Sequence, residues 1–320
     1  MSNQDMNQAV TSELHERPLV TFALFAYNQE KYIRAAVEGA FAQEYSPLEI
    51  ILSDDCSTDR TFEIMQELAA NYRGPHEVIL NRNETNRGLT PHVFGVARLA
   101  KGTLLIAAAG DDISFPNRTH AIVENWNQTC CSAFTSDEEH YDESGTYIGY
   151  IERRASADCC VEDFTSVTKS LGCTWAIERD LLLKYPSPSR DMINEDVFLG
   201  LIAMLHNGVS YLPMATVKRT TGVGISSDRR FGSRIEEKIV FLTRRRALLE
   251  TMSEALRIAE QDKYEAIVEK ELKLVNHLLK YAKTGRHFWG SLASIVKHGQ
   301  REHIREIFKV SLFRLVKFKV

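Results

Sequence analysis

The sequence predicts an α/β fold, a mostly parallel sheet with helices on both faces, followed by a C-terminal helical extension. Short apolar runs alternate with amphipathic stretches over residues 20–109, and the runs are almost continuously apolar. Strands of this composition are typical of parallel sheets that are buried on both faces. With 44% hydrophobic and 26% charged residues, the 320-residue chain is neither disordered nor collagen-like.

Four apolar runs are predicted to form the first strands. They span residues 20–26, 49–53, 77–80 and 103–109. Apolar residues at helical spacing predict helices at 32–43, 61–72 and 90–100. Polar turns follow three of the runs, at residues 27–30, 54–59 and 110–112.

The alternation is less regular after residue 115. We expect helices at 118–126, 179–184 and 197–206, and strands joined by polar turns over 133–151. Residues 218–234, rich in Gly, Ser, Thr and Arg, predict a loop. A long helical stretch then carries a recurring apolar face, formed by Ile235, Ile239, Leu242, Leu249, Met252, Leu256 and Ala259.

The net charge of −4 hides a basic C-terminal segment. Residues 283–320 hold nine Lys and Arg and two Glu, so this segment carries +7 and residues 1–282 carry −11. Residues 298–320 place apolar side chains along one helical face, which predicts a helix lying on an anionic membrane surface. The alternative is a helix packed on the 235–259 face, within the chain or in a homodimer. No nucleic-acid-binding motif accompanies the charge, so no nucleic-acid partner is expected.

The sequence contains no pattern for export or membrane insertion. No stretch approaches the roughly 18 uninterrupted apolar residues of a spanning helix, and residues 1–17 lack the apolar core of a secretory signal. The six cysteines form no C-x-x-C pattern, so reduced thiols are expected. We therefore expect a cytoplasmic protein, or one that is peripheral at the inner face of the membrane.

Carboxylates follow two of the predicted strands: Asp54 and Asp55 after the second, Asp111 and Asp112 after the fourth. Ligands of open parallel sheets gather beyond these strand ends. A single aspartate there is often only a helix cap or a turn residue, but two pairs are harder to explain in that way. The chain lacks G-x-x-x-x-G-K-[ST], and no G-x-G-x-x-G follows the first strand, which counts against a P-loop NTPase and a dinucleotide dehydrogenase.

The order of motifs resembles the inverting glycosyltransferases of family 2, which have the Rossmann-like GT-A fold. The match runs from about residue 18 to 208. Five stretches carry it: AYNQEKYI at 26–33, FAQEY at 41–45 with LEIILSDDCSTD at 48–59, NRG at 86–88 with Ala97 and Gly102, GDD at 110–112 in place of the D-x-D motif, and ED at 195–196. Two departures stand out, because Cys56 replaces a glycine of the D-D-G-S motif and the Asp111–Asp112 carboxylates are adjacent.

The resemblance implies roles on the donor side. Phe25, Ala26 and Tyr27 would line the nucleotide pocket, Asp54 would support the turn, Asp55 would accept a hydrogen bond from the base, and Asp111 would lie near the ribose. Asp112 would hold Mn²⁺ or Mg²⁺ on the diphosphate. Arg87 would reach the nucleotide or remain a solvated surface residue. Arg219 lies in a stretch, 218–227, that resembles a mobile loop over the diphosphate, although a linker is the alternative.

The resemblance also implies roles on the acceptor side. Asp196 would be the catalytic base, with Glu195 beside it. Trp175 would stack on a sugar ring or belong to the core. The chain would then divide into a polar segment (1–17), a GT-A domain (18–230, with nucleotide-binding and acceptor-binding halves at 18–112 and 113–230) and a basic helical extension (231–320).

These roles predict an inverting, metal-assisted transferase. It would move a sugar from a nucleoside-diphosphate sugar, with UDP-sugars favoured, to a hydroxyl of a glycan or lipid-linked glycan in bacterial-type surface polysaccharide or glycoconjugate synthesis. No residue decides among uracil, guanine and thymine. One alternative is a sugar-1-phosphate nucleotidyltransferase, whose glycine-rich basic loop is missing from residues 18–33. The other is a degenerate glycosyltransferase-like scaffold or glycan-binding module.

Overall fold

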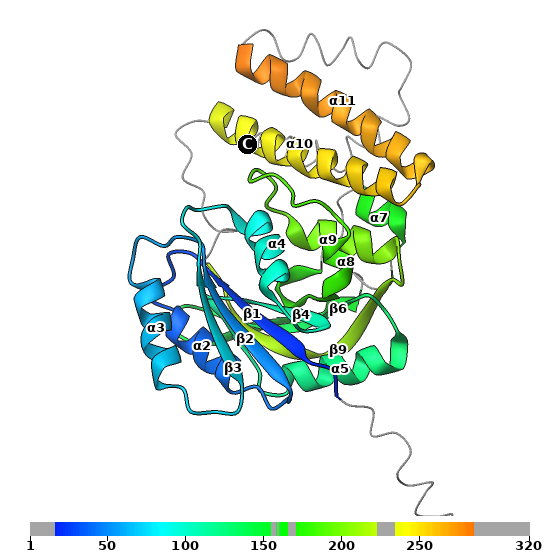
Figure 1. Ribbon diagram of the computed structural model, residues 1–320. Helices are drawn as coiled ribbons and strands as arrows, with labels where there is room; N and C mark the ends of the chain where they lie inside the picture. The colour runs from blue at the N-terminus through cyan, green and yellow to red at the C-terminus, as the bar shows by residue number, and fades with distance from the viewer. Residues whose placement is uncertain (1–16, 155–157, 159, 166–170, 223–233, 285–320) are drawn as a thin grey trace, which may run out of the picture.

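One nine-stranded sheet organises the described chain, in the order β3-β2-β1-β4-β8-β6-β9-β5 with β7 paired to β6 (Figure 1). The structure is a computed structural model that describes residues 17–154, 158, 160–165, 171–222 and 234–284. The strands are β1 (Val20–Ala26), β2 (Leu48–Asp54), β3 (Glu77–Arg82), β4 (Leu104–Ala109), β5 (Asp112–Ser114), β6 (Ala133–Tyr141), β7 (Tyr147–Ile151), β8 (Ala176–Glu178) and β9 (Val209–Thr220).

Helices cover both faces of this sheet (Figure 1). They are α2 (Ile33–Phe41), α3 (Thr61–Asn71), α4 (Leu89–Leu99), α5 (Arg118–Thr129), α7 (Val161–Thr165), α8 (Arg179–Leu183), α9 (Glu195–Met204), α10 (Arg234–Ile258) and α11 (Asp262–Thr284), with the 3₁₀ turn η1 (Gly172–Thr174). Helices α2, α3 and α5 lie on one face, and α4, α8 and α9 lie on the other. The α10–α11 hairpin packs over α9 and α7.

The first half of the sheet confirms the predicted alternation. Strands β3, β2, β1 and β4 are parallel neighbours, and their limits agree with the predicted runs within two residues. Ala26 is paired with Asp54, and Phe25 is paired with Ala109. The carboxyl ends of β1, β2 and β4 therefore meet at one edge of the sheet.

The second half of the sheet is mixed and corrects one prediction. Residues 218–220 were expected in a loop, but they end β9, which is parallel to β6 and antiparallel to β5. Their polar side chains do not form the apolar pattern that predicts a strand. Backbone pairing to two neighbouring strands, rather than burial of apolar side chains, holds these residues in the sheet. The rest of the predicted loop, from residue 223 to 233, lies outside the described residues.

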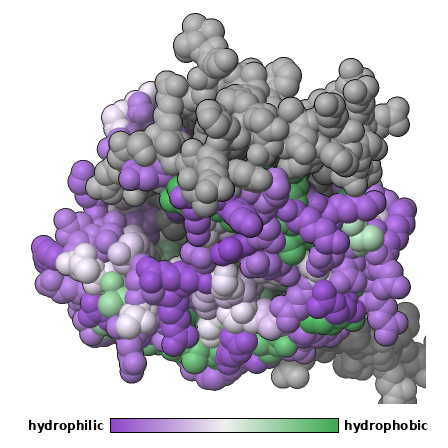
Figure 2. All heavy atoms as spheres, turned by 90° about the horizontal axis from the view of Figure 1, so that it is seen from above, coloured by the Kyte–Doolittle hydropathy of each residue, from purple (hydrophilic) through white to green (hydrophobic). Residues whose placement is uncertain are grey.

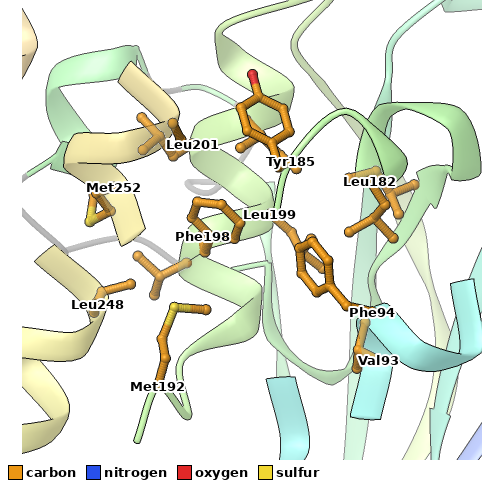
Figure 3. Close-up of a cluster of buried hydrophobic side chains, with 14 of the residues drawn as sticks. Val93, Phe94, Leu182, Tyr185, Met192, Phe198, Leu199, Leu201, Leu248 and Met252 are labelled. Carbon is orange, nitrogen blue, oxygen red and sulfur yellow. The ribbon is translucent and has the colours of Figure 1, made fainter. Parts of the chain in front are cut away.

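Helix α9 is held between two other helices by aromatic and aliphatic side chains (Figure 3). The Phe198 ring lies 6.2 Å from the Phe94 ring of α4 and 6.2 Å from the Tyr185 ring. On its other side α9 contacts α10, which contributes Leu248 and Met252 to the same buried cluster. These contacts fix the first turn of α9, where the predicted Glu195–Asp196 pair lies.

The helical extension is described only as far as residue 284. The basic segment 285–320 lies outside the described residues, so its predicted membrane and dimer contacts stay predictions. Among the described helices, none is both long and apolar enough to cross a bilayer. On the face shown in Figure 2 the described residues are mainly hydrophilic, and hydrophobic ones form small separate groups.

Gly102 allows the turn before β4 to lie against β1, and this contact gives a test of the packing. A Cβ at residue 102 would overlap the backbone of Val20 and Thr21, whose hydroxyl accepts the Gly102 N–H at 2.9 Å. We expect Gly102→Ala to lower the free energy of unfolding by about 1–3 kcal/mol in urea titrations. Gly149→Ala is the control, because a Cβ there meets nothing within 4 Å. Equal stabilities of the two variants would contradict this packing.

Candidate active site

Backbone hydrogen bonds join the turns beyond the strand ends. The Asp55 N–H donates to the Ala26 carbonyl, and the Gly110 N–H donates to the Phe25 carbonyl, both at 2.9 Å. Phe25 and Ala26 are buried, whereas the Tyr27 side chain is 40% exposed. The predicted nucleotide-pocket residues and both acidic pairs are therefore assembled at one edge of the sheet.

Asp54 organises the turn after β2. Its carboxylate accepts hydrogen bonds from the Ser57 N–H, at 2.9 Å, and from the Ser57 hydroxyl, and it lies 3.3 Å from Arg82 Nε. Cys56, between these residues, has a φ of 63°, in the left-handed region that favours glycine. The related motif has glycine at this position, and Cys56 adopts a conformation that glycine reaches without strain.

Asp55 binds the loop that leads into α4. Its Oδ1 accepts hydrogen bonds from Asn83 Nδ2 at 2.7 Å and from the Arg87 N–H at 2.8 Å, and its Oδ2 accepts one from the Gly88 N–H at 2.8 Å. Asp55 is only 3% exposed. The backbone of Arg87 thus contacts the site, and its exposed residue surface leaves the guanidinium near solvent. Asn83 was not predicted as a site residue, since the third strand was expected to end at residue 80.

A buried histidine of α4 packs against the ends of β1 and β2. His92 Nε2 is 2.5 Å from the Ser53 hydroxyl, and its ring meets the edge of Phe25 at 5.2 Å. Burial lowers the pKa of His92 to about 4, although Asp55 and Asp54 oppose this shift. His92 is therefore neutral at physiological pH and adds no charge to the site.

Asp111 and Asp112 lie in the turn from β4 to β5. The Gln29 side chain hydrogen-bonds Asp111, and Asp112 Oδ1 accepts the Thr220 N–H at 3.1 Å. Burial, with the neighbouring charge of Asp111, raises the pKa of Asp112 to about 7, and Arg219 opposes the shift. Two adjacent carboxylates that lack full compensation provide hard oxygen ligands suited to Mg²⁺ or Mn²⁺.

Arg219 connects the acidic turn to a buried glutamate that the sequence did not predict. It pairs with Asp112 across β5 and β9, and its Nη1 lies 3.7 Å from Glu138 Oε1. Glu138 also accepts hydrogen bonds from Arg153 Nη2 and, at 2.7 Å, from Cys173 Sγ. Burial disfavours its charge, but Arg153, Cys173 and Arg219 hold the pKa of Glu138 below its ordinary value. No motif in the sequence marks Glu138 or Arg153.

The acidic pair of α9 lies next to this cluster. Asp196 Oδ2 accepts the Gly172 N–H at 3.3 Å, and Oδ1 accepts the Val197 N–H at 2.9 Å. Burial and the adjacent Asp196 raise the pKa of Glu195 to about 8. The Trp175 side chain hydrogen-bonds Glu195 and is 2% exposed, within the core. Its ring is therefore not open to a sugar, and of the two predicted roles the core position is the one observed.

A buried arginine lies below the acidic turn. Arg118 Nη1 donates to the Ser114 hydroxyl at 2.9 Å, and its other side-chain nitrogens have no hydrogen-bond partner among the described residues. Burial lowers the pKa of Arg118 to about 10, with Cys173 and Asp112 opposing the shift. The guanidinium remains charged at neutral pH and adds positive potential below Asp112.

These contacts connect the residues predicted for the donor side of the site with those predicted for the acceptor side. From Asp112 they lead through Arg219 to Glu138, and then through η1 to Asp196. Within the described residues no group of three or more His, Cys, Asp or Glu side chains is arranged to hold a metal ion. A cation here would take one or two protein carboxylates, and its remaining ligands would come from a bound phosphate and water.

Comparisons with known proteins agree with this architecture. Residues 21–184 match the model of glycosyl transferase family 2. The putative glycosyltransferase EpsE of Bacillus subtilis (strain 168) is 32% identical over 133 residues, which cover 42% of this chain and 44% of EpsE. The matched segments span less than half the length of the curated relatives.

Two solved structures share the fold. S. aureus TarS 1–349 in complex with UDP-GlcNAc gives a TM-score of 0.54 at 16% identity, over 83% of this chain and 87% of that one. Mannosyltransferase PcManGT from Pyrobaculum calidifontis, in complex with GDP-Man and Mn²⁺, gives 0.52 at 18% identity, over 89% and 82%. At these identities the likeness extends to the fold alone.

The raised pKa of Glu195 makes stability depend on pH. The folded chain keeps the Glu195 proton up to about pH 8, whereas the ordinary value for glutamate is 4.5, so the folded state binds more protons between these values. The free energy of unfolding contributed by this group therefore falls as pH rises through that range, by roughly 2–4 kcal/mol. Urea unfolding at pH 5, 7 and 8.5 measures the effect.

Glu195→Gln keeps an uncharged side chain and should lose most of this pH dependence. Glu254→Gln, at an exposed position of α10, is the matched control and should keep the wild-type profile. If Glu195→Gln and wild type showed the same decline, the buried protonated carboxyl would be disproved.

Proposed function

Because the chain belongs to glycosyl transferase family 2, we propose that it is an inverting glycosyltransferase that uses a nucleoside-diphosphate sugar. The observation that supports this proposal most strongly is a series of contacts. It joins the Asp55 turn and the Asp111–Asp112 turn to the end of β1, and it leads from Asp112 through Arg219, Glu138 and η1 to Asp196. Asp55, Asp112 and Asp196 come from three distant segments of the chain. Their assembly is what transfer between two bound substrates would require.

The nucleotide would bind over the ends of β1 and β2. Phe25, Ala26 and the exposed Tyr27 would line the base and ribose, with Asp55 accepting a hydrogen bond from the base. Asp54 would hold the turn after β2 in place through its hydrogen bonds with Ser57. Asp111, on the neighbouring turn, would lie near the ribose. Arg87 would approach the nucleotide from solvent.

The diphosphate would lie between Asp112 and Arg219. When bound, Mn²⁺ or Mg²⁺ neutralises the negative charge that gathers on a departing nucleoside diphosphate. Asp112, with Asp111 beside it, would hold this ion. The Arg219 guanidinium, partly exposed and fixed in β9, would add a hydrogen-bonding positive charge to the phosphate oxygens.

Asp196 would act as the base. Two backbone N–H groups, those of Gly172 and Val197, orient its carboxylate. Removal of the hydroxyl proton by Asp196 would activate the acceptor oxygen for attack on the anomeric carbon from the face opposite the diphosphate, which inverts that centre. Glu195, protonated at neutral pH, would donate a hydrogen bond to the acceptor or the donor sugar. Trp175 would position Glu195.

The acceptor would be a hydroxyl of a glycan or lipid-linked glycan in surface polysaccharide or glycoconjugate synthesis. The basic segment 283–320 would bring the enzyme to an anionic membrane surface where such a lipid-linked acceptor lies. Its alternative contact, with the helical extension of a second copy, would be seen as a dimer in solution.

Asp196→Asn tests the base. We expect transfer from a UDP-sugar to slow by about 10²–10⁴-fold, because the amide cannot take the hydroxyl proton. UDP affinity, measured by titration calorimetry, should stay within about twofold of wild type. Asp191→Asn changes an exposed carboxylate of the preceding loop and should leave both quantities unchanged. Near-normal turnover of Asp196→Asn would remove the proposed role.

Asp112→Asn tests the cation. Mn²⁺ should raise the UDP affinity of the wild type by about tenfold or more, since Asp112 would hold the ion and the ion would offset the negative charge of the diphosphate. The variant should lose most of this increase, and a chelator should abolish it in the wild type. Asp180→Asn, whose side chain is 86% exposed, is the control. An unchanged Mn²⁺ effect in Asp112→Asn would exclude Asp112 as a ligand.

A further inference from the structure

The Asp55 carboxylate has hydrogen-bond donors on three of its lone pairs. An ionised carboxylate offers about four such sites, two on each oxygen. Asn83 Nδ2 and the Arg87 N–H fill both sites of Oδ1, and the Gly88 N–H takes one site of Oδ2. Among the described contacts, Asp55 therefore keeps one acceptor site, on Oδ2.

The three donors are fixed by the surrounding backbone. Gly88 has a φ of 84°, and a Cβ there would come within 3.0 Å of the Arg190 side chain, so the loop before α4 has little room to move. The Asn83 N–H donates to the Asp54 carbonyl at 2.9 Å, which also ties Asn83 to the end of β2. Because the Asn83 amide faces a carboxylate, it must present its NH₂ group. The occupation of Oδ1 is thus part of the folded structure.

Nucleobases differ in the number of N–H donors that they present to a carboxylate. Uracil and thymine carry a single ring N–H between two carbonyl groups. Guanine carries two adjacent donors, N1–H and the N2 amino group, which fit a carboxylate with one free site on each oxygen. Cytosine and adenine direct a ring nitrogen lone pair toward the carboxylate, beside their amino group, and this contact is repulsive. A single free site on one oxygen therefore matches uracil or thymine.

We propose that Asn83 is a specificity-determining residue that, by occupying Oδ1 of Asp55, restricts the donor nucleotide to a uracil or thymine base and disfavours guanine. This inference rests on the proposed function, in which Asp55 accepts a hydrogen bond from the base. Asn83 acts through Asp55 and need not touch the nucleotide. The fold alone does not set this choice, because the solved structures of similar fold hold UDP-GlcNAc in one case and GDP-Man in the other.

The test compares UDP, dTDP and GDP on the full chain with Mn²⁺ present, by titration calorimetry. The wild type should bind UDP and dTDP at least about tenfold more tightly than GDP, because one guanine donor would be left without an acceptor. Asn83→Ala frees the second site of Oδ1 and should raise the GDP affinity relative to UDP by about fivefold or more. Asn83→Ser provides a second, shorter variant, and thermal unfolding verifies that each variant is folded.

Asn81→Ala is the matched control. Asn81 is a neighbouring asparagine near the end of β3, two residues before Asn83, but its amide donates to the Ser53 hydroxyl at 2.8 Å and makes no described contact with Asp55. It should leave the GDP-to-UDP affinity ratio at the wild-type value.

The outcomes separate this inference from the proposed function. Wild-type affinity for GDP equal to or above that for UDP would overturn the inference while leaving a nucleotide-binding enzyme. An unchanged affinity ratio in the folded Asn83 variants would overturn the role of Asn83. If none of the three nucleotides bound, the proposed function itself would fail, and the inference with it.

Discussion

Burying several carboxylates at one edge of a sheet is the constraint on which this structure depends. A buried ionised carboxylate is costly unless hydrogen bonds or opposite charges compensate it. Glu138 is compensated by arginines and a thiol, and Asp55 by backbone and amide N–H groups. Asp112 and Glu195 are compensated less completely, and their pKa values are raised to about 7 and about 8. Additional positive charge near Asp112 would therefore stabilise its ionised form, and Glu195 retains its proton at neutral pH. Under the proposed function, these are the places where the diphosphate and the acceptor hydroxyl would bind.

Rigid packing allows this charge arrangement to persist. The first turn of α9 cannot move away from η1 without disturbing the contacts of Phe198 with Phe94 of α4 and with Tyr185, and those of α9 with α10. The helical extension thus has a structural role in the site, because α10 covers the outer face of the helix that carries Asp196. Sub-ångström positioning of a base has large effects on rate, so a distant helix can matter to the chemistry.

Sequence reasoning predicted the parts of the fold that local patterns encode. The parallel strands and their helices follow from apolar periodicity, and the acidic pairs follow from motif order. The end of β9, residues 218–220, was predicted as a loop because these residues are polar and are held by strand pairing, which depends on distant β5 and β6. Glu138 and Asn83 were missed for a related reason, because each is identified as a site residue only by its contact with a residue far away in the sequence. Glu138 contacts Arg219, and Asn83 contacts Asp55. Cys56 shows the reverse case, since a residue other than glycine takes the left-handed conformation at the place where the motif has glycine.

Under the proposed function, different residues would recognise the base and stabilise the transfer reaction. Charge compensation around Asp112 and Asp196 would stabilise transfer whatever base the donor carries, because it acts on the diphosphate and the acceptor hydroxyl. Base choice would instead depend on a count of hydrogen-bond donors around Asp55, which one amide side chain can alter. Asn83 lies after β3, whereas Asp112 lies after β4, which is on the other side of β1. The residues that would select the base and those that would hold the diphosphate therefore belong to different turns. Under the proposed function, a substitution at Asn83 would therefore change the choice of nucleotide while the electrostatics around Asp112 and Asp196 stay intact.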